Sequence, residues 1–349
     1  ATFVTDSLRK PRLVVDLSYQ NEHLEDRPFR YETLASFVAL LKPGDHMVSW
    51  DISDAFHHIR LDPKDSERLA FSVDGVLYYP LSLPFGLKLA PWALTKVMRP
   101  VLAFLRLGGL TLLGYVDDFA AVTSSALPCS SAAATRARRQ AVALFLRLGI
   151  QVHPTKGAEV GVTTLDLLGF RIDSVRRLLL LPPQRLDKVV GAAHSLRRAA
   201  ASNRRWARVR ALQRFCGLAF SCSPAVPLAR FRFHALYQCL KCSGGRSQTR
   251  LSSAAMTDLA WWTGLASSPE VGRALWQQPV VAELTTDASG YGWGAVLNRT
   301  VPARGFFSLT EQQDHINVQE LMALDKALDC FPMVTGPGVL RLRLDSTVN

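Results

Sequence analysis

Apolar and polar residues follow three different patterns along the chain. Up to about residue 181, short runs rich in β-branched and aromatic residues alternate with stretches of helical periodicity, which predicts mixed α/β or α+β structure. Pro182 and Pro183 end this region, because neither a strand ladder nor a helix interior accommodates two prolines. From residue 184 to about 266 the pattern is helical, and after Pro279 it returns to strands. We therefore expect three regions, 1–182, 183–278 and 279–349.

Turn-forming residues mark the ends of several elements within these regions. A Ser/Ala-rich stretch at 123–135 predicts a loop that leads into a helix from about Ala134 to Leu148, and Gly149 ends that helix. The Ser/Gly-rich stretch 242–249 predicts a flexible connection. In the last region we expect a helix near 318–328 and strands at 280–286, 294–297 and 339–344.

Composition adds a large core and a basic surface to this picture. The 349 residues are 48% apolar and 20% charged, which excludes a disordered or fibrous chain. Lys and Arg number 41 against 29 acids, and the net charge of +12 favours a polyanionic partner such as nucleic acid. Between residues 185 and 214 nine Lys or Arg accompany one acid, which favours a phosphate-binding surface over a solvated helix face of mixed charge. The candidate nucleic-acid-binding residues are Arg197, Arg198, Arg204, Arg205 and Arg208.

The six cysteines and the apolar runs bear on compartment and membrane. No secretory signal precedes the cysteines, so we expect them to be reduced and the protein to be intracellular, either cytoplasmic or nuclear. Cys239 and Cys242 have metal-ligand spacing, and a zinc site there competes with the alternative that both are small buried hydrophobes. The most apolar stretch, 101–116, is too short and too interrupted to cross a bilayer, so we expect no membrane role. The chain begins without Met, and we expect it to be part of a longer polypeptide.

Three acids near the ends of apolar runs carry the first candidate chemistry. Asp51 ends one run, and Asp117 and Asp118 lie between two others, which predicts a β-hairpin with both acids at its tip. Alone, the Asp-Asp pair is typical of an ordinary surface turn. Together with Asp51 it forms the set of oxygen ligands that two Mg²⁺ ions about 4 Å apart need for an in-line phosphoryl displacement.

At these residues the sequence resembles the palm of a reverse transcriptase. Tyr115-Val-Asp-Asp118 matches the Y-x-D-D box, and Asp51-Ile-Ser-Asp-Ala-Phe56 is similar to motif A. Four other segments resemble, in the family's order, the fingers segment, motif B, motif D and the primer grip: Arg12 to Asn21, Leu83 to Pro91, His153 to Lys156 and Leu167 to Arg171. The resemblance covers most of residues 10–215 and is much more specific than a single motif.

The resemblance implies a right-hand polymerase of the α+β class. Fingers and palm would extend to residue 182, and a helical thumb and connection would follow to 278. The implied reaction is extension of a primer on an RNA or DNA template with dNTPs. Asp51, Asp117 and Asp118 would be catalytic and would hold Mg²⁺, or Mn²⁺ in its place. Lys156 would protonate the leaving pyrophosphate, unless it is only an exposed lysine after a turn.

Further residues would bind the incoming nucleotide. Arg12 and Lys10 would pair with the triphosphate. Phe56 stands where the family places a ring under the sugar, so that a ribose 2′-hydroxyl is excluded. Gly86 would let the backbone approach the template pair, and Phe85 stands where retroviral enzymes have Gln.

The neighbouring His57 and His58 suggest a metal site at first sight. Alternation along a strand would point the two rings to opposite faces, so we do not expect them to share a ligand role.

A second set of acids follows in the last region. Asp287 ends a strand before a glycine-rich turn, Glu320 lies in the first turns of an amphipathic helix, and Asp345 ends a further strand. This order resembles the ribonuclease H fold, in which such acids bind two Mg²⁺ ions. The family requires a fourth acid and a later helix, so we expect a truncated domain with impaired or absent RNA cleavage by this chain alone.

A palm followed directly by a ribonuclease H domain is the order of long-terminal-repeat and tyrosine-recombinase retroelements, which implies a polyprotein. The motif phrasing at residues 83–101 and 315–321 most resembles DIRS-type elements, with gypsy-type elements and pararetroviruses next. Two other classes stay open. An RNA-dependent RNA polymerase uses a similar palm but normally avoids an aromatic residue such as Phe56. A catalytically inactive or domesticated element fragment would only bind nucleic acid through its basic block.

Overall fold

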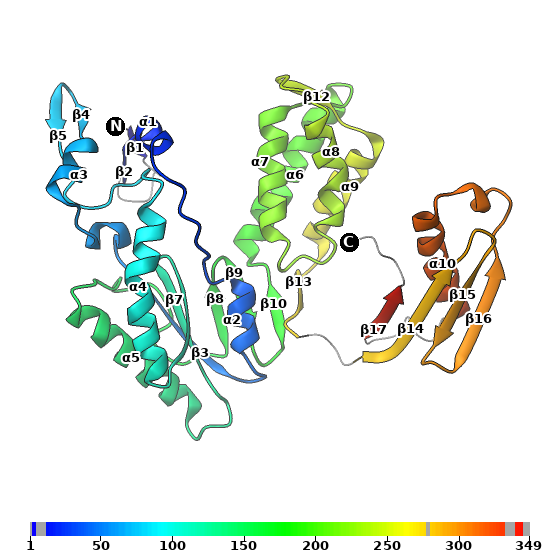
Figure 1. Cartoon of the computed structure of the whole chain (residues 1–349), viewed down its shortest axis with the longest axis horizontal. Coiled ribbons are helices and arrows are strands. Elements are labelled where there is room, and N and C mark those ends of the chain that lie inside the picture. The colour runs from blue at the N-terminus through cyan, green and yellow to red at the C-terminus, as the bar shows by residue number, and fades with distance from the viewer. Residues whose placement is uncertain (1, 5–11, 277–279, 332–338, 345–349) are drawn as a thin grey trace. The chain divides into compact units, whose positions relative to one another are not determined.

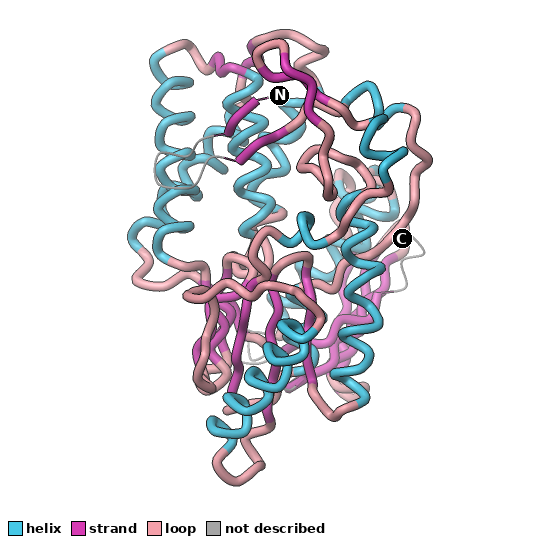
Figure 2. The backbone as a smooth tube through the Cα atoms, turned by 90° about the vertical axis from the view of Figure 1, so that its left-hand side faces the viewer, coloured by secondary structure: helices cyan, strands magenta, loops and turns pink. Residues whose placement is uncertain are grey.

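A three-stranded antiparallel sheet, in the order β3-β7-β6, underlies the first unit of the chain, residues 1–275, in the computed structural model (Figure 1). A second unit, residues 276–349, has a sheet of its own. The structure describes residues 2–4, 12–276, 280–331 and 339–344, and long helices and short strands alternate along it (Figure 2). No helix in these ranges is long and apolar enough to cross a membrane.

Two long helices, α4 and α5, lie along the three-stranded sheet (Figure 1). The helix α4 buries Leu94, Met98 and Leu102 at helical spacing. Trp50 of β3 stacks on Phe119 of β7, with ring centroids 5.8 Å apart, and both rings meet a phenylalanine of α5 edge-on. The elements are β3 (His46–Asp51), α4 (Ala90–Leu107), β6 (Thr111–Tyr115), β7 (Asp118–Thr123) and α5 (Ser130–Arg147).

Short elements precede and interrupt this core. β1 pairs with β2, and β4 pairs with β5, each as an antiparallel two-stranded ribbon. The helix α2 begins with a capping box, in which the side chains and backbone N–H groups of Thr33 and Ser36 satisfy each other. The elements are β1 (Thr2–Val4), β2 (Arg12–Val14), α1 (Ser18–Glu22), α2 (Leu34–Leu40), η1 (Ala55–His58), α3 (Pro63–Arg68), β4 (Phe71–Val73) and β5 (Val76–Tyr78).

A second sheet and a helical bundle complete the first unit. The sheet has the order β13-β10-β9-β8, and in the bundle α6 packs against α7 and α9 (Figure 1). Phe215 and Trp262 meet inside the bundle with ring centroids 5.9 Å apart. The strands are β8 (Thr164–Leu167), β9 (Phe170–Asp173), β10 (Leu178–Leu180), β11 (Trp206–Arg208), β12 (Gln248–Arg250) and β13 (Gly272–Ala274). The helices are α6 (Pro183–Ser202), α7 (Val209–Cys222), η2 (Phe231–Phe233), α8 (His234–Lys241), α9 (Ser253–Gly264) and η3 (Leu265–Ser267).

The second unit is a four-stranded sheet covered on one face by α10. The order is β16-β15-β14-β17, and β17 runs parallel to β14. Leu284, Trp293 and Ala323 are buried between the sheet and the helix. The elements are β14 (Val280–Ala288), β15 (Gly292–Leu297), β16 (Val301–Phe306), η4 (Glu311–Gln313), α10 (Ile316–Cys330) and β17 (Val339–Leu344). The expected strands and helix of this region are confirmed, and β16 is an additional strand that the pattern missed.

Three local expectations are corrected. The helix α5 begins at Ser130, four residues before the expected start, because Cys129 adopts φ 52° and turns the chain into the helix early. Part of the expected flexible connection is β12, which pairs with β11. His57 and His58 lie in the 3₁₀ helix η1 and not in a strand, so the alternation argument does not apply to them. His58 Nε2 instead accepts a hydrogen bond from the Gln151 backbone N–H at 2.9 Å.

Candidate active site

A β-hairpin carries two of the candidate catalytic acids. The strands β6 and β7 pair in antiparallel register up to Tyr115 and Asp118, which leaves Val116 and Asp117 as the two-residue turn. Val116 has φ 54°, a left-handed conformation that a β-branched residue rarely adopts. The predicted hairpin with the acids at its tip is confirmed, and its turn holds Val116 under local strain.

Asp51 reaches the same place from the neighbouring strand. In the register of β3 and β7, Asp51 is the direct partner of Asp118. The backbone N–H of Ile52 donates to the carbonyl of Asp117 at 2.9 Å, so the chain after β3 is bonded to the turn itself. The pairing of these strands therefore brings the three acids together, although 65 residues separate Ile52 from Asp117 along the chain.

Lys156 joins the acids from a loop that follows α5. Its Nζ lies 3.1 Å from Oδ1 and 3.0 Å from Oδ2 of Asp51, whose side chain is 11% exposed. The loop is fixed on β3, because His153 N–H donates to the Asp51 carbonyl at 2.8 Å. Gly157 has φ 91°, and a Cβ there would lie 2.4 Å from the Ser49 carbonyl oxygen. Only glycine lets the loop approach β3 this closely.

The pKa of Asp118 reflects both its burial and the charges of the neighbouring acids. Burial, followed by the negative charges of Asp117 and Asp51, raises the pKa of Asp118 to about 6, and Lys156 offsets this shift in part. Like charges therefore accumulate at this point of the sheet, and one ammonium group balances them incompletely.

The donor set fits a divalent cation. Carboxylate oxygens are the ligands that Mg²⁺ prefers. Burial and, after it, repulsion from Asp117 and Asp51 raise the pKa of Asp118, and a bound cation would offset both effects. In the described part of the chain, no three His, Cys, Asp or Glu side chains are already grouped as around a metal ion. The acids thus supply the negative charge and the oxygen ligands that a cation needs. In this structure the ammonium group of Lys156 supplies positive charge beside them.

Phe56, Phe85 and Gly86 form a second group of predicted site residues. The rings of Phe56 and Phe85 meet edge-on with centroids 5.4 Å apart, and Phe56 also packs against the core cluster that contains Trp50. Gly86 has φ 102°, and a Cβ there would lie 2.5 Å from the Val15 carbonyl oxygen. The close backbone approach at Gly86 is therefore to the N-terminal segment of this chain, whereas its expected approach to a template stays a prediction.

Asn21 is a residue of this group that the motifs did not single out. Its Nδ2 donates to the Gly86 carbonyl at 2.8 Å, and its Oδ1 accepts from the Lys88 N–H at 2.8 Å. One amide side chain thus fastens the N-terminal segment to the loop that carries Phe85. Asn21 ends the fingers-like segment, and its place in that motif was the available signal.

The structure does not describe the side chains of three predicted site residues. Lys10 and Asp345 fall outside the described residues, and Arg12 is described only as the first residue of β2, without its side chain. The predictions for the triphosphate and for the third acid of the second unit therefore stay predictions.

The five arginines of the basic block do not form one cluster. Arg197 and Arg198 are exposed on α6, and Arg197 Nη1 lies 3.4 Å from Thr263 Oγ1. Arg204 and Arg205 form the turn after α6 with φ of 45° and 69°. Arg208 ends β11 and lines a groove of about 1080 Å³ between α6, β11 and α7. Trp206, Arg210 and Arg214 line the same groove, so the structure joins Arg208 to these residues and not to the other four.

In the second unit, Asp287 and Glu320 belong to the strand and helix that pack together. Asp287 is exposed near the end of β14, and Glu320 is half-buried on α10. Oε2 of Glu320 is buried without a hydrogen-bond partner among the described residues. A buried carboxylate oxygen of this kind fits a cation or a bound water.

The cysteine pair behaves differently at its two positions. Cys239 is buried and Cys242 is exposed, and both are free thiols. Burial, with a smaller effect of Cys239, raises the pKa of Cys216 to about 12, so that thiol is protonated at neutral pH. These facts favour the interpretation of Cys216 and Cys239 as buried hydrophobes.

Comparison with known sequences places the first half of the chain. Residues 7–172 match the family model for reverse transcriptase (RNA-dependent DNA polymerase). Protein P of duck hepatitis B virus (strain China) is 32% identical over 169 residues, which cover 46% of this chain and 20% of that protein. The retrovirus-related Pol polyprotein from transposon gypsy of Drosophila melanogaster is 30% identical over 116 residues, 33% of this chain and 11% of that protein. The matched part thus spans a fifth or less of the length of these relatives.

Comparison with solved structures concerns the fold. The foamy viral protease-reverse transcriptase dRH in complex with ds DNA has a TM-score of 0.63 and 18% identity, and the match covers 97% of this chain and 57% of that one. The foamy viral protease-reverse transcriptase in complex with RNA/DNA hybrid has a TM-score of 0.59 and 18% identity, over 95% and 43% of the two chains. The predicted α+β, right-hand polymerase fold is confirmed.

Proposed function

We propose that this chain, whose residues 7–172 are a reverse transcriptase domain, acts as an RNA-directed DNA polymerase. It would extend a primer with dNTPs on an RNA or DNA template. The observation that carries the proposal is the pairing of Asp51 with Asp118 across β3 and β7, beside Asp117 and Lys156. Carboxylates that meet from a strand end and the neighbouring hairpin can hold the divalent cations that assist phosphoryl transfer.

The acids and the lysine have different parts in this reaction. Asp51, Asp117 and Asp118 would hold Mg²⁺, or Mn²⁺, which stabilises the charge that develops on the attacking and leaving oxygens. The primer 3′-hydroxyl attacks the α-phosphorus of the nucleotide, and pyrophosphate leaves. Lys156 is ion-paired with Asp51 in this structure. Once Asp51 binds a cation instead, the Lys156 ammonium would be free to supply a proton to the leaving group.

The nucleotide site would select for deoxyribose through Phe56. Its ring is fixed by the contact with Phe85 and by the core below it, so it cannot move aside easily for a 2′-hydroxyl. Lys10 and Arg12 remain the proposed triphosphate ligands, and the exposed arginines of the thumb remain the proposed contacts to nucleic acid.

The decisive test is Mg²⁺-dependent extension of a labelled DNA primer on an RNA template. Extension by the chain that disappears in the Asp117→Asn, Asp118→Asn double variant supports the proposal. A folded chain that binds the primer and template but adds no nucleotide favours the alternative, an inactive or domesticated fragment that only binds nucleic acid. In the same assay Phe56→Ala should admit ribonucleotides, and unchanged selectivity would remove the steric role of Phe56.

The second unit supports a second candidate function, ribonuclease H activity at Asp287, Glu320 and Asp345. The buried, unpartnered Oε2 of Glu320 is the observation that favours it. We keep the expectation that RNA cleavage by this chain alone is impaired or absent. Cleavage of an RNA–DNA hybrid that is abolished by Asp287→Asn would show that expectation to be wrong.

We further propose that the chain is part of a polyprotein of an intracellular retroelement, of the DIRS type. The motif phrasing supports this subfamily, and the gypsy polyprotein among the relatives supports the polyprotein context.

A further inference from the structure

The strand that leads into the catalytic turn lies at an edge of its sheet. β6 pairs with β7 on one side only, and its other side would leave main-chain groups without strand partners. On that outer side the N–H of Gly114 and the carbonyl of Leu112 are two residues apart, as expected for groups that point the same way from a strand. A strand that is hydrogen-bonded on one side only is held less firmly than a central strand, unless other groups bond its outer side.

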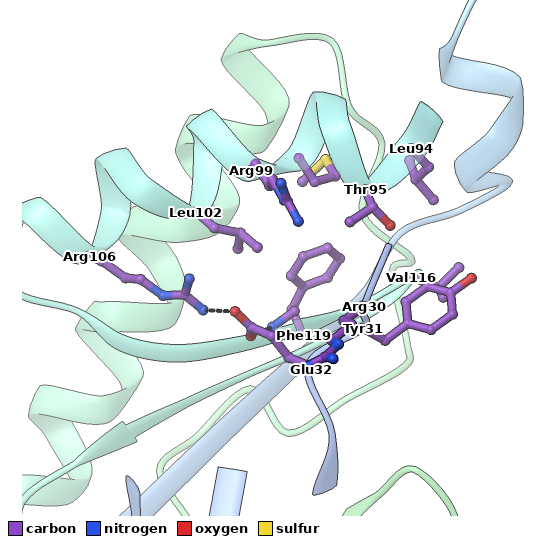
Figure 3. A pocket seen from close by; sticks show the side chains of 12 residues that line it. Arg30, Tyr31, Glu32, Leu94, Thr95, Arg99, Leu102, Arg106, Val116 and Phe119 are labelled. Carbon is purple, nitrogen blue, oxygen red and sulfur yellow. Dashed lines mark hydrogen bonds and ion pairs between the residues drawn. The ribbon is translucent and has the colours of Figure 1, made fainter. Parts of the chain in front are cut away.

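Two charged side chains hydrogen-bond the main chain of β6 on this outer side, as a neighbouring strand would. Oε2 of Glu32 accepts a hydrogen bond from Gly114 N–H at 2.8 Å, and Nη2 of Arg106 donates to the Leu112 carbonyl at 2.9 Å. The two side chains are also paired with each other, Arg106 Nη2 to Glu32 Oε1 at 2.5 Å (Figure 3). The pair therefore reproduces one N–H and one C=O partner of a missing strand.

Arg106 projects from α4, and Glu32 from the segment that leads into α2, and the two elements are fixed independently. Glu32 directly precedes Thr33, the N-cap of α2, and the capping box sets the path of the chain there. Arg106 lies in the last turn of α4, next to the buried Leu105. Between the two helices the hairpin is packed tightly, since a Cβ on Gly114 would lie 2.7 Å from Leu102 Cδ1.

The surroundings of the pair connect it to the turn. Glu32 and Arg106 line a cavity of about 340 Å³ together with Val116, the strained residue of the turn (Figure 3). Tyr31 contacts Tyr115 with ring centroids 5.0 Å apart. The segment that carries Glu32 therefore touches the hairpin at its edge and at its last residue before the turn.

We propose that Glu32 and Arg106 are positioning residues that hold the hairpin bearing Asp117 and Asp118 in its reactive place. The proposal rests on the proposed polymerase function. An ordinary surface ion pair would contribute little, and the side chains of Glu32 and Arg106 are 34% and 41% exposed. What distinguishes this pair is that each member also bonds the main chain of the catalytic hairpin.

The test compares Glu32→Ala, Glu32→Gln and Arg106→Lys with a matched ion pair far from the hairpin in sequence. Arg176 and Glu270 form a bidentate pair of similar exposure, and in the described part of the chain neither side chain hydrogen-bonds the β6-β7 hairpin, so Glu270→Gln is the control. Because small displacements of reacting groups are expensive, we expect kcat of Glu32→Ala to fall about 10- to 100-fold while KM for dNTP stays nearly constant. Glu32→Gln, which keeps an acceptor for Gly114, should lie between Glu32→Ala and the wild type, and Glu270→Gln should match the wild type.

Hydrogen exchange of the Gly114 and Asp118 amides separates this proposal from the proposed function. Loss of a bond to a charged acceptor should speed exchange at Gly114 about tenfold or more in Glu32→Ala. Unchanged exchange overturns the positioning role whatever the activity, and so does faster exchange with an unchanged kcat. A wild-type chain without any extension contradicts the proposed function, and the exchange rates then decide whether the pair holds the hairpin.

Discussion

The carboxylates of the two units are held in different ways. In the first unit, Asp51 and Asp118 are register partners on neighbouring strands, and their repulsion with Asp117 contributes to the raised pKa of Asp118. In the second unit, Asp287 is exposed near the end of a strand, and Glu320 reaches the sheet from a helix. Backbone pairing thus assembles the first cluster before any ligand binds, whereas the second depends on side chains from two separate layers.

Removing one acid from each set should separate the two clusters most strongly. Asp51→Asn should reduce the rate of single-nucleotide incorporation at least about a hundredfold, because an interaction with developing charge is lost. Asp287→Asn should leave that rate at the wild-type value, since it belongs to another unit. Rapid-quench measurement of both variants tests this, and equal losses would contradict the assignment of the two sets to separate reactions.

Replacing a glycine next to each set of acids should change the stability of the protein in opposite directions. Gly157→Ala should lower the free energy of unfolding by about 1–3 kcal/mol, because its φ is 91° and the Ser49 carbonyl leaves no space for a Cβ. Gly294 is the register partner of Asp287, and a Cβ there meets nothing within 4 Å. Gly294→Ala should therefore raise the free energy by up to about 1 kcal/mol. Urea unfolding would measure both, and a neutral Gly157→Ala would show that the Lys156 loop is not held closely on β3.

The burial of Asp118 and its repulsion by the neighbouring acids should be visible as a pH-dependent loss of stability. The folded pKa of Asp118 is raised to about 6, so its ionised form opposes folding above that pH, and the effect fades as pH falls from 6 towards 4. In EDTA, Asp118→Asn should therefore raise Tm at pH 7.5 and lose this advantage near pH 4. Asp287→Asn should have no comparable effect at either pH. A Tm gain for Asp118→Asn that is independent of pH would exclude the ionisation of Asp118 as its cause.

The smallest expected effect concerns an acid of the second unit whose pKa moves in the opposite direction. The backbone N–H of Ser308 and the ammonium of Lys326 lower the pKa of Glu311 to about 2. Its ionised form therefore contributes stability above its unfolded pKa of about 4.5, and this contribution is lost as pH falls towards 2. Glu311→Gln should lower the Tm of the second unit slightly at pH 7 and not at pH 2, as followed by circular dichroism. A difference that persists at pH 2 would assign the effect to packing.

The sequence predicted the parts of the site that depend on strand order. Asp51, Asp117 and Asp118 lie at the ends of apolar runs, and the hairpin pattern was enough to place two of them on one turn. The same alternation failed at His57 and His58, because Asp54, with φ 49°, turns the chain out of the strand and into η1. Hydrophobic periodicity does not show where a residue adopts the left-handed conformation. Glycine often marks such a position in the sequence, but an aspartate does not.

Contacts between distant segments were beyond the sequence. Lys156 pairs with Asp51 across 105 positions, and Arg106 pairs with Glu32 across 74. Motif D pointed to Lys156, but nothing in the pattern indicated Glu32, which reads as one more solvated acid before a helix. Such pairs depend on the packing of helices on a sheet, and side-chain spacing along one element does not encode it.

The two edges of the sheet β3-β7-β6 affect how the molecules behave at high concentration. On the outer side of β3, Met47 exchanges two backbone hydrogen bonds with Val162, at 2.7 and 2.9 Å. On the outer side of β6, Glu32 and Arg106 occupy Gly114 and Leu112. Both outer strands are thus covered at these groups by the chain itself, which hinders edge-to-edge aggregation of one sheet with that of another molecule. The residues that bond the β6-β7 hairpin would by the same contacts protect the protein against self-association.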